Sequence, residues 1–131
     1  MIGILIISHG DLGGSLIHCA NHVMGEKSQY LAHLSVTIRD DPDVVVPKAQ
    51  ELVKELDRGE GVLVLSDICG ATPCNIASRL ISPGKVECLA GVNLPMLVRA
   101  LTYRNESLLV AGEKALAGGR EGVMRLGPGM T

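Results

Sequence analysis

Residues 2–8 read Ile-Gly-Ile-Leu-Ile-Ile-Ser, and this short apolar stretch decides the fold class. It is rich in β-branched side chains and does not alternate with polar residues. It therefore predicts a strand that is buried on both faces. Such strands are typical of parallel sheets that helices cover on both sides. Residues 62–66, Val-Leu-Val-Leu-Ser, predict a second central strand of the same kind.

Along the rest of the chain, apolar runs alternate with segments of helical periodicity. Strands are expected at residues 2–8, 30–36, 62–66 and 86–91, and helices at 15–24, 42–56, 73–81, 95–103 and 107–116. Asp41 and Thr72 are the expected N-caps of the second and third helices, because each precedes a proline that suits the first helical position. Gly118-Gly119 is expected to end the last helix, and Glu121 to Leu126 to add a short edge strand.

This alternation predicts one α/β domain over residues 1–131, with an open, mostly parallel doubly wound sheet and helices on both faces. A flavodoxin-like strand order, 2-1-3-4, would place the first and third strands side by side. In such sheets the functional site lies at the carboxyl ends of the strands. That rule selects three turns, at residues 9–14, 67–72 and 92–95.

Composition limits the function classes. Hydrophobic residues make up 47% of the chain, whereas two tyrosines are its only aromatic residues, so the core must be aliphatic. The net charge of −2 and the lack of a basic cluster argue against nucleic-acid binding. No apolar run is long enough to cross a membrane, and no basic leader precedes the first, so a cytoplasmic protein is expected. The four cysteines, Cys19, Cys69, Cys74 and Cys88, form no CxxC pair and are expected to be reduced, mostly buried thiols.

His9 and Asp67 are the candidate catalytic residues, because each follows a predicted central strand. Imidazole is a nucleophile near neutral pH when its second nitrogen is held as a proton donor, and a carboxylate is a natural holder. If the two strands are neighbours, the two side chains meet. The alternative is that His9 is a turn residue bonded to the backbone and that Asp67 belongs to an ordinary turn before a helix.

The same turns can supply hydrogen-bond donors for a phosphate. Gly10 and Gly13–Gly14 leave backbone N–H groups before the first helix, and Gly70 does so before the third. Thr72 adds a hydroxyl group. The predicted phosphate-binding residues are Gly10, Gly70, Ala71 and Thr72. Equally, the glycines could serve tight turns alone, and Thr72 could act only as a cap.

The other three histidines give weaker indications of a functional site. His18 and His22 are four residues apart on one face of a predicted helix and could chelate a metal, but no acidic or thiol partner is evidently placed. His33 lies in a predicted strand and is expected to be structural. No metal and no cofactor are therefore predicted.

Three motifs carry a resemblance to a known family: the opening, Ile-Gly-Ile-Leu-Ile-Ile-Ser-His-Gly-Asp-Leu-Gly; the segment Asp67–Asn75, Asp-Ile-Cys-Gly-Ala-Thr-Pro-Cys-Asn; and residues 91–97, Gly-Val-Asn-Leu-Pro-Met-Leu. In this order they resemble the enzyme IIA component of the mannose/fructose/sorbose class of the bacterial phosphoenolpyruvate–sugar phosphotransferase system. The resemblance covers nearly the whole chain.

The resemblance implies a phosphotransferase with a phosphohistidine intermediate. His9 would accept the phosphoryl group from phosphorylated HPr, on Nε2, and pass it to a IIB component. Asp67 would partner the histidine at Nδ1. The resemblance also implies a homodimer, in which Glu121 to Leu126 would pair as an antiparallel strand on the partner's sheet.

The sequence departs from the family pattern in one turn. Cys69 and Cys74 stand where the family has aromatic residues, and Ala71 and Thr72 stand where it has glycine and serine. These departures could alter the surface that docks HPr or a IIB component. A regulatory phosphorelay that transports no sugar is an alternative function. A small metal chelatase and the phosphotransfer subunit of dihydroxyacetone kinase are further alternatives. The chelatase needs a second metal-binding histidine late in the chain, and no histidine follows His33.

Overall fold

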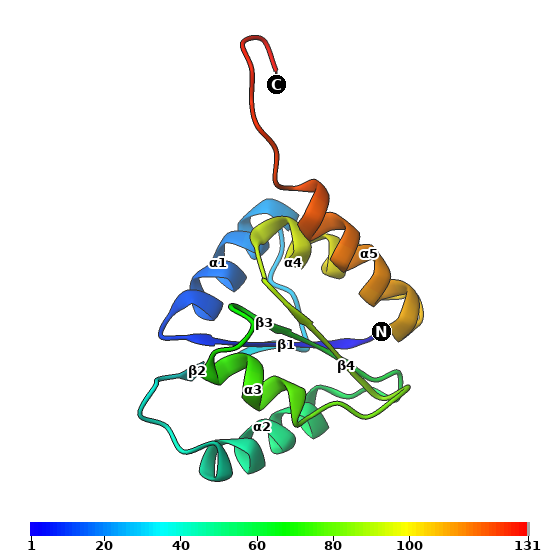
Figure 1. Ribbon diagram of the computed structural model, residues 1–131. Helices are drawn as coiled ribbons and strands as arrows, with labels where there is room; N and C mark the ends of the chain where they lie inside the picture. Colours follow the sequence, from blue (N-terminus) through cyan, green and yellow to red (C-terminus); the bar gives the residue numbers. More distant parts are fainter. Residues whose placement is uncertain (131) are drawn as a thin grey trace.

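The computed structural model describes residues 1–130 and consists of a four-stranded sheet between two layers of helices (Figure 1). The strands are β1 (Gly3–His9), β2 (Leu31–Val36), β3 (Val62–Ser66) and β4 (Val86–Ala90). The helices are α1 (Leu12–Met24), α2 (Pro42–Leu56), α3 (Thr72–Ser78), α4 (Leu94–Thr102) and α5 (Leu108–Glu121). This is the α/β architecture that the alternating pattern predicts.

The strand order is β2-β1-β3-β4, and every neighbouring pair of these strands is parallel. The predicted order 2-1-3-4 is therefore confirmed. Ile7 of β1 lies in register with Ser66 of β3, so the two strands end close together at the same edge of the sheet. Each strand is followed by a helix, which returns the chain to the opposite end of the sheet.

Both faces of the sheet are apolar, as the unbroken hydrophobic runs predict. Ile4 and Ile6 of β1 point into a core beneath α1, α4 and α5, whereas Leu5 and Ile7 point into a second core beneath α2 and α3. All four side chains are fully buried. Because successive residues of a strand face opposite sides, a strand covered on both sides needs apolar residues at every position.

The first and third helices begin differently from the prediction. Helix α1 starts at Leu12 rather than Ser15, so Gly13 and Gly14 lie inside it. A side chain at either position would press on His33 of β2, which explains why both residues are glycines. Helix α3 begins at Thr72 itself, with Ala71 as its N-cap, and ends at Ser78. Thr72 is thus the first helical residue and not the predicted cap, which leaves its hydroxyl group without a capping role.

The prediction that Gly118-Gly119 ends the last helix is wrong. Helix α5 continues to Glu121, and both glycines are buried inside it. A Cβ atom at Gly118 would lie 2.6 Å from Cβ of Arg99, and one at Gly119 would lie 2.9 Å from Cε of Met96. The glycines therefore allow close contact between α4 and α5, and this packing outweighs their weak helix propensity.

The predicted C-terminal edge strand is not present in the sheet of this chain. Residues beyond Gly122 leave the end of α5 and extend away from the domain (Figure 1). Val123, Met124 and Leu126 are all more than half exposed. The segment pairs with no strand among residues 1–130, because it points away from both open sheet edges, β2 and β4.

Arg104 stabilises the end of the sheet opposite His9, where β1 and β2 begin. Its buried guanidinium group donates hydrogen bonds to the backbone carbonyls of Ile2, Gln29 and Tyr30, at 2.7–3.3 Å. Burial lowers the pKa of this guanidinium group. These bonds join the loop after α4 to the starts of β1 and β2.

The cysteines are less buried than predicted. Cys19 and Cys69 are exposed, Cys74 and Cys88 are half-buried, and all four are free thiols. Within residues 1–130, none of the helices has the length and apolar character needed to cross a membrane.

We predict that Gly118→Ala destabilises the protein by roughly 1–3 kcal/mol, the usual range for overpacking a core. Alanine favours a helix over glycine by about 1 kcal/mol, but the new methyl group would overlap Arg99 on α4. Chemical denaturation of the variant and the parent measures the difference.

Gly112→Ala in the same helix is the matched control. Its Cβ atom would meet mainly the flexible end of Glu87, at 3.1 Å, so that helix propensity decides and stability stays equal or rises. Equal effects of the two substitutions would contradict the packing explanation for Gly118.

Candidate active site

The candidate site lies where β1 and β3 end. His9 is the last residue of β1, and Asp67 directly follows β3. Parallel pairing brings these strand ends together, although His9 and Asp67 are 58 positions apart in the sequence. The structure therefore unites the two residues that the sequence singled out.

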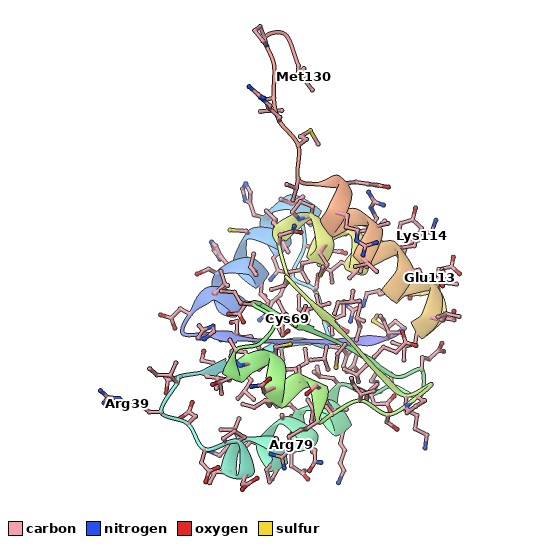
Figure 2. The ribbon with its side chains drawn as sticks, viewed as in Figure 1. Arg39, Cys69, Arg79, Glu113, Lys114 and Met130 are labelled. Atoms are coloured by element: carbon pink, nitrogen blue, oxygen red, sulfur yellow. The ribbon has the colours of Figure 1, made fainter. Side chains whose placement is uncertain are left out.

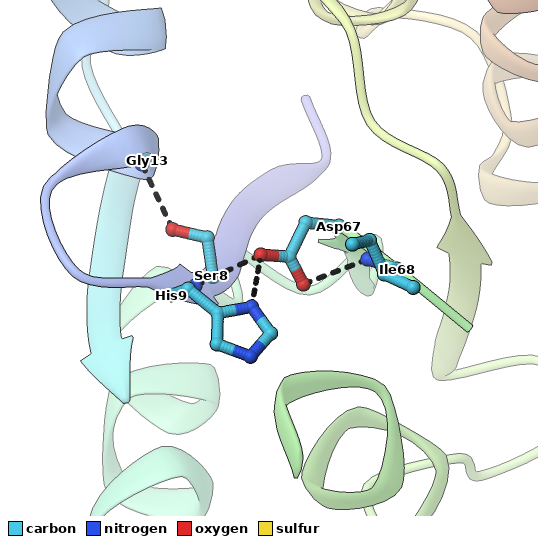
Figure 3. Close-up of polar contacts among 5 residues, drawn as sticks. All are labelled: Ser8, His9, Gly13, Asp67 and Ile68. Carbon is cyan, nitrogen blue, oxygen red and sulfur yellow. Dashed lines mark hydrogen bonds and ion pairs between the residues drawn. The ribbon is translucent and has the colours of Figure 1, made fainter. Parts of the chain in front are cut away.

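The Asp67 carboxylate holds His9 at two points (Figure 3). Its Oδ2 atom lies 2.7 Å from Nδ1 of the imidazole ring and accepts a hydrogen bond of 2.9 Å from the backbone N–H of His9. Its Oδ1 atom accepts a hydrogen bond of 2.8 Å from the N–H of Ile68. Only 7% of the Asp67 side chain is exposed. Backbone N–H groups thus fix both oxygens of the carboxylate, and the carboxylate in turn fixes the orientation of the ring.

The surroundings of Asp67 favour its ionised form. Burial by itself raises the pKa of the carboxyl group, but hydrogen bonds from the His9 backbone, the His9 ring and the Ile68 backbone outweigh burial and hold this pKa below its ordinary value. An ionised carboxylate is a hydrogen-bond acceptor only, so Nδ1 of His9 carries the proton.

This tautomer leaves Nε2 as the nitrogen with a lone pair in the neutral ring. Nε2 lies on the side of the ring away from Asp67 (Figure 3), and 38% of the His9 side chain is exposed. No residue from 1 to 130 forms a hydrogen bond with Nε2. The arrangement presents a nucleophilic nitrogen to solvent and supports positive charge on the ring from behind.

The turn after Asp67 offers hydrogen-bond donors at the same edge of the sheet as His9. The N–H of Ala71 donates to the Ile68 carbonyl at 3.4 Å, and Gly70 between them has φ +89°, a conformation that glycine tolerates best. The turn leads into α3, which packs against β1 and β3. Neither the hydroxyl nor the backbone N–H of Thr72 has a hydrogen-bond partner within residues 1–130. Thr72 can therefore donate to a ligand.

The turn after β1 is less open to a ligand than the sequence suggests. The N–H of Gly10 donates to the Val36 carbonyl at 3.2 Å, and the N–H of Gly13 donates to Oγ of Ser8 at 2.8 Å. The predicted donors Gly10 and Gly13 are therefore engaged within the protein. Ser8 is fully buried and fixes the start of α1 behind His9, a role that no sequence pattern indicated.

Comparison with known proteins identifies the family. A family model described as "PTS system fructose IIA component", where PTS is the phosphotransferase system, matches residues 3–115. The chain belongs to this enzyme IIA family.

Two curated relatives show how far the similarity extends. The "PTS system mannose-specific EIIAB component" of Escherichia coli K12 is 34% identical over 128 residues, which cover 95% of this chain. The chain spans only 39% of that relative's length. The "PTS system fructose-specific EIIA component" of Bacillus subtilis 168 is 30% identical over 110 residues, which cover 83% of this chain and 75% of the relative.

Solved structures agree with the fold of this IIA chain. The phosphotransferase system component EIIA from Streptococcus agalactiae has 26% identity and a TM-score of 0.83, over 95% of this chain and 97% of the other. The mannose/sorbose specific IIA subunit from Enterococcus faecalis has 23% identity and a TM-score of 0.85, over 99% and 98%. The latter similarity supports the fold alone.

The third predicted turn, residues 92–95, holds the site in place but offers it no side chain, because Asn93 is bonded within the protein. The N–H groups of Gly91 and Val92 donate to the backbone carbonyls of Asp67 and Ser66, which holds the end of β3 in place. Asn93 caps α4 by accepting from Met96 N–H at 2.9 Å. Its amide group also donates to a carbonyl of α5 at 3.0 Å.

The remaining histidines lie away from His9. His18 and His22 are exposed on α1, and His33 is exposed on β2. Among residues 1–130, no three histidine, cysteine, aspartate or glutamate side chains are grouped so that they could hold a metal ion. His33 is exposed because β2 is an edge strand, and its side chain lies next to Gly13 and Gly14 of α1.

We predict a specific acid sensitivity from the lowered pKa of Asp67. An unfolded aspartate titrates near pH 3.9, so the stabilisation from the ionised carboxylate is complete above about pH 5 and is lost as the pH falls through the lower folded pKa. Thermal unfolding should show the parent as more stable than Asp67→Asn at neutral pH, with the difference shrinking in acid.

Asp11→Asn is the control, because Asp11 is exposed at the same edge of the sheet and its side chain forms no hydrogen bond within residues 1–130. Its pH profile should follow the parent. A difference between the parent and Asp67→Asn that stays constant down to about pH 2 would contradict the lowered pKa.

Proposed function

We propose that His9 accepts a phosphoryl group from phosphorylated HPr and passes it to a IIB component, in the cytoplasm. The observation that carries the proposal is the bond between Asp67 Oδ2 and His9 Nδ1, which leaves Nε2 unprotonated and accessible. Membership of the enzyme IIA family supports the class of reaction. A phosphocarrier needs a nucleophile that can also act as a leaving group, and imidazole meets both needs.

The proposed transfer proceeds by direct displacement. The lone pair of Nε2 attacks phosphorus while the bond between phosphorus and the donor breaks. The ring gains positive charge, which the ionised Asp67 carboxylate stabilises through the Nδ1–H hydrogen bond. In the second half of the cycle the acceptor attacks phosphorus and the electron pair of the P–N bond returns to Nε2. No metal and no cofactor enter either step.

The proposed phosphate-binding groups are the backbone of Gly70 and Ala71 and the hydroxyl and N–H of Thr72. Support comes from the packing of α3, into which this turn leads, against β1, and from the hydroxyl and N–H of Thr72, which have no partner within residues 1–130. The Ala71 N–H is held only by the long 3.4 Å turn bond, so it can turn toward a stronger acceptor. Gly10 is left out, because its N–H is bonded to Val36.

We also propose a homodimer in which residues 123–126 pair with the sheet of a second copy; Glu121, where the predicted strand began, is instead the last residue of α5. The support is the apolar, extended segment itself and the open edge strand β4. Sedimentation velocity of the full chain should give a dimer, whereas the chain ending at Gly122 should be a monomer. A monomeric full chain at micromolar concentration would reject this proposal.

We expect the reduced full chain to gain one phosphoryl group, about 80 Da, when incubated with phosphoenolpyruvate, enzyme I and the cognate HPr. His9→Ala should gain none, because it lacks Nε2. Intact-mass measurement at neutral or alkaline pH detects the group, since phosphohistidine is labile in acid.

His18→Ala is the matched control, as an exposed histidine on the following helix, and it should be phosphorylated like the parent. A parent that gains no mass would reject the phosphocarrier proposal. If the parent is phosphorylated, a second assay measures whether it passes the phosphoryl group to a IIB component of a sugar transporter. Such transfer supports sugar transport, whereas a regulatory phosphorelay needs only the first step.

We predict that Thr72→Val slows phosphorylation of His9 by roughly tenfold, the effect expected when one hydrogen bond to a charged group is lost. Valine keeps the shape of threonine but removes the hydroxyl group. Thr72→Ser retains that group and should react at nearly the parent rate in a rapid-quench assay. Equal rates for the valine and serine variants would exclude the hydroxyl from phosphate binding.

A further inference from the structure

Most arginines of this chain lie on its surface. Arg39 extends into solvent from the loop after β2, and Arg79 lies in the layer of α2 and α3 (Figure 2). Arg79 also forms an ion pair with Asp43, with 3.1 Å between Nη1 and Oδ1. Arg104 differs in both respects. Only 7% of this residue is exposed, and no carboxylate within residues 1–130 forms an ion pair with it.

Backbone carbonyls satisfy all but one of the N–H groups of Arg104. A guanidinium group has five such donors. Nε and Nη2 donate three hydrogen bonds to the carbonyls of Ile2 and Tyr30, and Nη1 donates one, at 2.7 Å, to that of Gln29. The second N–H of Nη1 has no acceptor within residues 1–130. A buried cation therefore keeps a free donor and has no anion beside it, which is an unfavourable state for a buried charge.

Arg104 lines a cavity of about 280 Å³ at the end of the sheet opposite His9. The cavity lies between the end of α1, the segment before β2 and the loop after α4. Gln29, the partner of Nη1, also lines this cavity, whereas Ile2 and Tyr30, the partners of Nε and Nη2, do not. Nη1 is therefore the guanidinium nitrogen on the side of the cavity.

The other polar side chains of the wall indicate what the cavity can bind. Lys27 adds a second cation, and Glu26 is the only carboxylate among the lining residues. A phosphate monoester carries about −1.5 to −2 charges at neutral pH, which two cations match better than one. Ser28 and Asn105 add a hydroxyl and an amide group, neither of which forms a side-chain hydrogen bond within residues 1–130. Such groups bind hydroxyl groups of a ligand.

We propose that this cavity binds a small phosphorylated polyol. Arg104 and Lys27 bind the phosphate group, and Ser28 and Asn105 bind hydroxyl groups of the carbon chain. Glu26 repels a bare anion but accepts a hydrogen bond from a hydroxyl group, so it favours an ester over inorganic phosphate. The volume lies just below the usual range for ligand pockets, about 300–1,000 Å³, which limits the ligand to a few carbon atoms. The site is independent of phosphotransfer by His9.

The first experiment is a titration of the full chain with glycerol phosphate, esterified at a terminal carbon, followed by proton–nitrogen NMR. Saturable shifts are expected for the amide signals of residues 24–29 and 101–105. The guanidinium N–H signals of Arg104 should shift with them, which reports on its contact with phosphate without any substitution. Absence of these shifts would overturn the proposal. Shifts confined to residues 70–72 would also overturn it, because the phosphate would then bind at the turn proposed for phosphoryl transfer.

Three compounds test the ligand class at the same ionic strength. Glycerol lacks the charge and should cause no shift. Glycerate, with a carboxylate, and inorganic phosphate, without the carbon chain, should each bind roughly tenfold more weakly than glycerol phosphate, the effect of losing one hydrogen bond to a charged group. A response to glycerol would contradict the role of the charge. Equal affinity for glycerate or for inorganic phosphate would contradict the assignment to a phosphorylated polyol.

Lys27→Glu tests the second cation and leaves the buried hydrogen bonds of Arg104 in place, because Lys27 is exposed. It should weaken binding of glycerol phosphate by roughly tenfold or more. Lys48→Glu is the matched control, since it makes the same change of charge at an exposed position of α2, in the other layer of helices. Its affinity should equal that of the parent. Equal weakening in both variants would reduce the effect to net charge and remove Lys27 from the site.

Asn105→Ala tests the part of the cavity that binds the carbon chain. The residue is exposed and its side chain forms no hydrogen bond within residues 1–130, so the variant should fold like the parent. It should weaken binding of glycerol phosphate by roughly threefold to tenfold and leave binding of inorganic phosphate unchanged. An equal loss for both compounds, or no loss for either, would exclude Asn105 from recognition of the polyol. Substitution of Arg104 is a poorer test, because its bonds to Ile2 and Tyr30 also stabilise the sheet.

Discussion

A single buried carboxylate connects the fold to the imidazole of His9. Asp67 accepts hydrogen bonds from the ring and backbone of His9 and from the backbone of Ile68, and these bonds keep it ionised in spite of its burial. A carboxylate in this state fixes both the tautomer and the direction of the ring. Without it, His9 would be an ordinary exposed histidine at the end of a strand, with either nitrogen free to carry the proton.

The carboxylate can do this because the sheet is rigid and its register is fixed. Strands β1 and β3 lie side by side at its centre, and each is buried between two aliphatic cores. If β1 shifted by one residue against β3, each of its side chains would move to the other face of the sheet, and His9 would no longer lie next to Asp67. Backbone bonds from the turn after β4 hold the end of β3, and Arg104 holds the far end of β1. The His9 side chain is therefore partly exposed, whereas the Asp67 carboxylate that holds it is buried.

Glycines inside helices set how closely the layers pack. Gly13 and Gly14 bring α1 close to His33 of β2, and Gly118 and Gly119 bring α5 close to α4. A core almost without aromatic residues has few large side chains to fill wide gaps, so close contact between elements is the other way to reach normal density. The same closeness explains why these glycines lie within helices, where local propensity would end or delay the helix.

The sequence by itself determined the fold class, the order of the strands and the two residues of the candidate site, because buried strands have an unmistakable apolar pattern and polar residues at their ends stand out. Its three motifs also indicated the enzyme IIA family, which the family match confirms. Tertiary structure alone decided which donors are free: the N–H groups of Gly10 and Gly13 are bonded to Val36 and Ser8, while Thr72 is left open. Hydrogen bonds between distant segments leave no periodic trace in a sequence, since they depend on which strands lie side by side and how closely the helices pack on them.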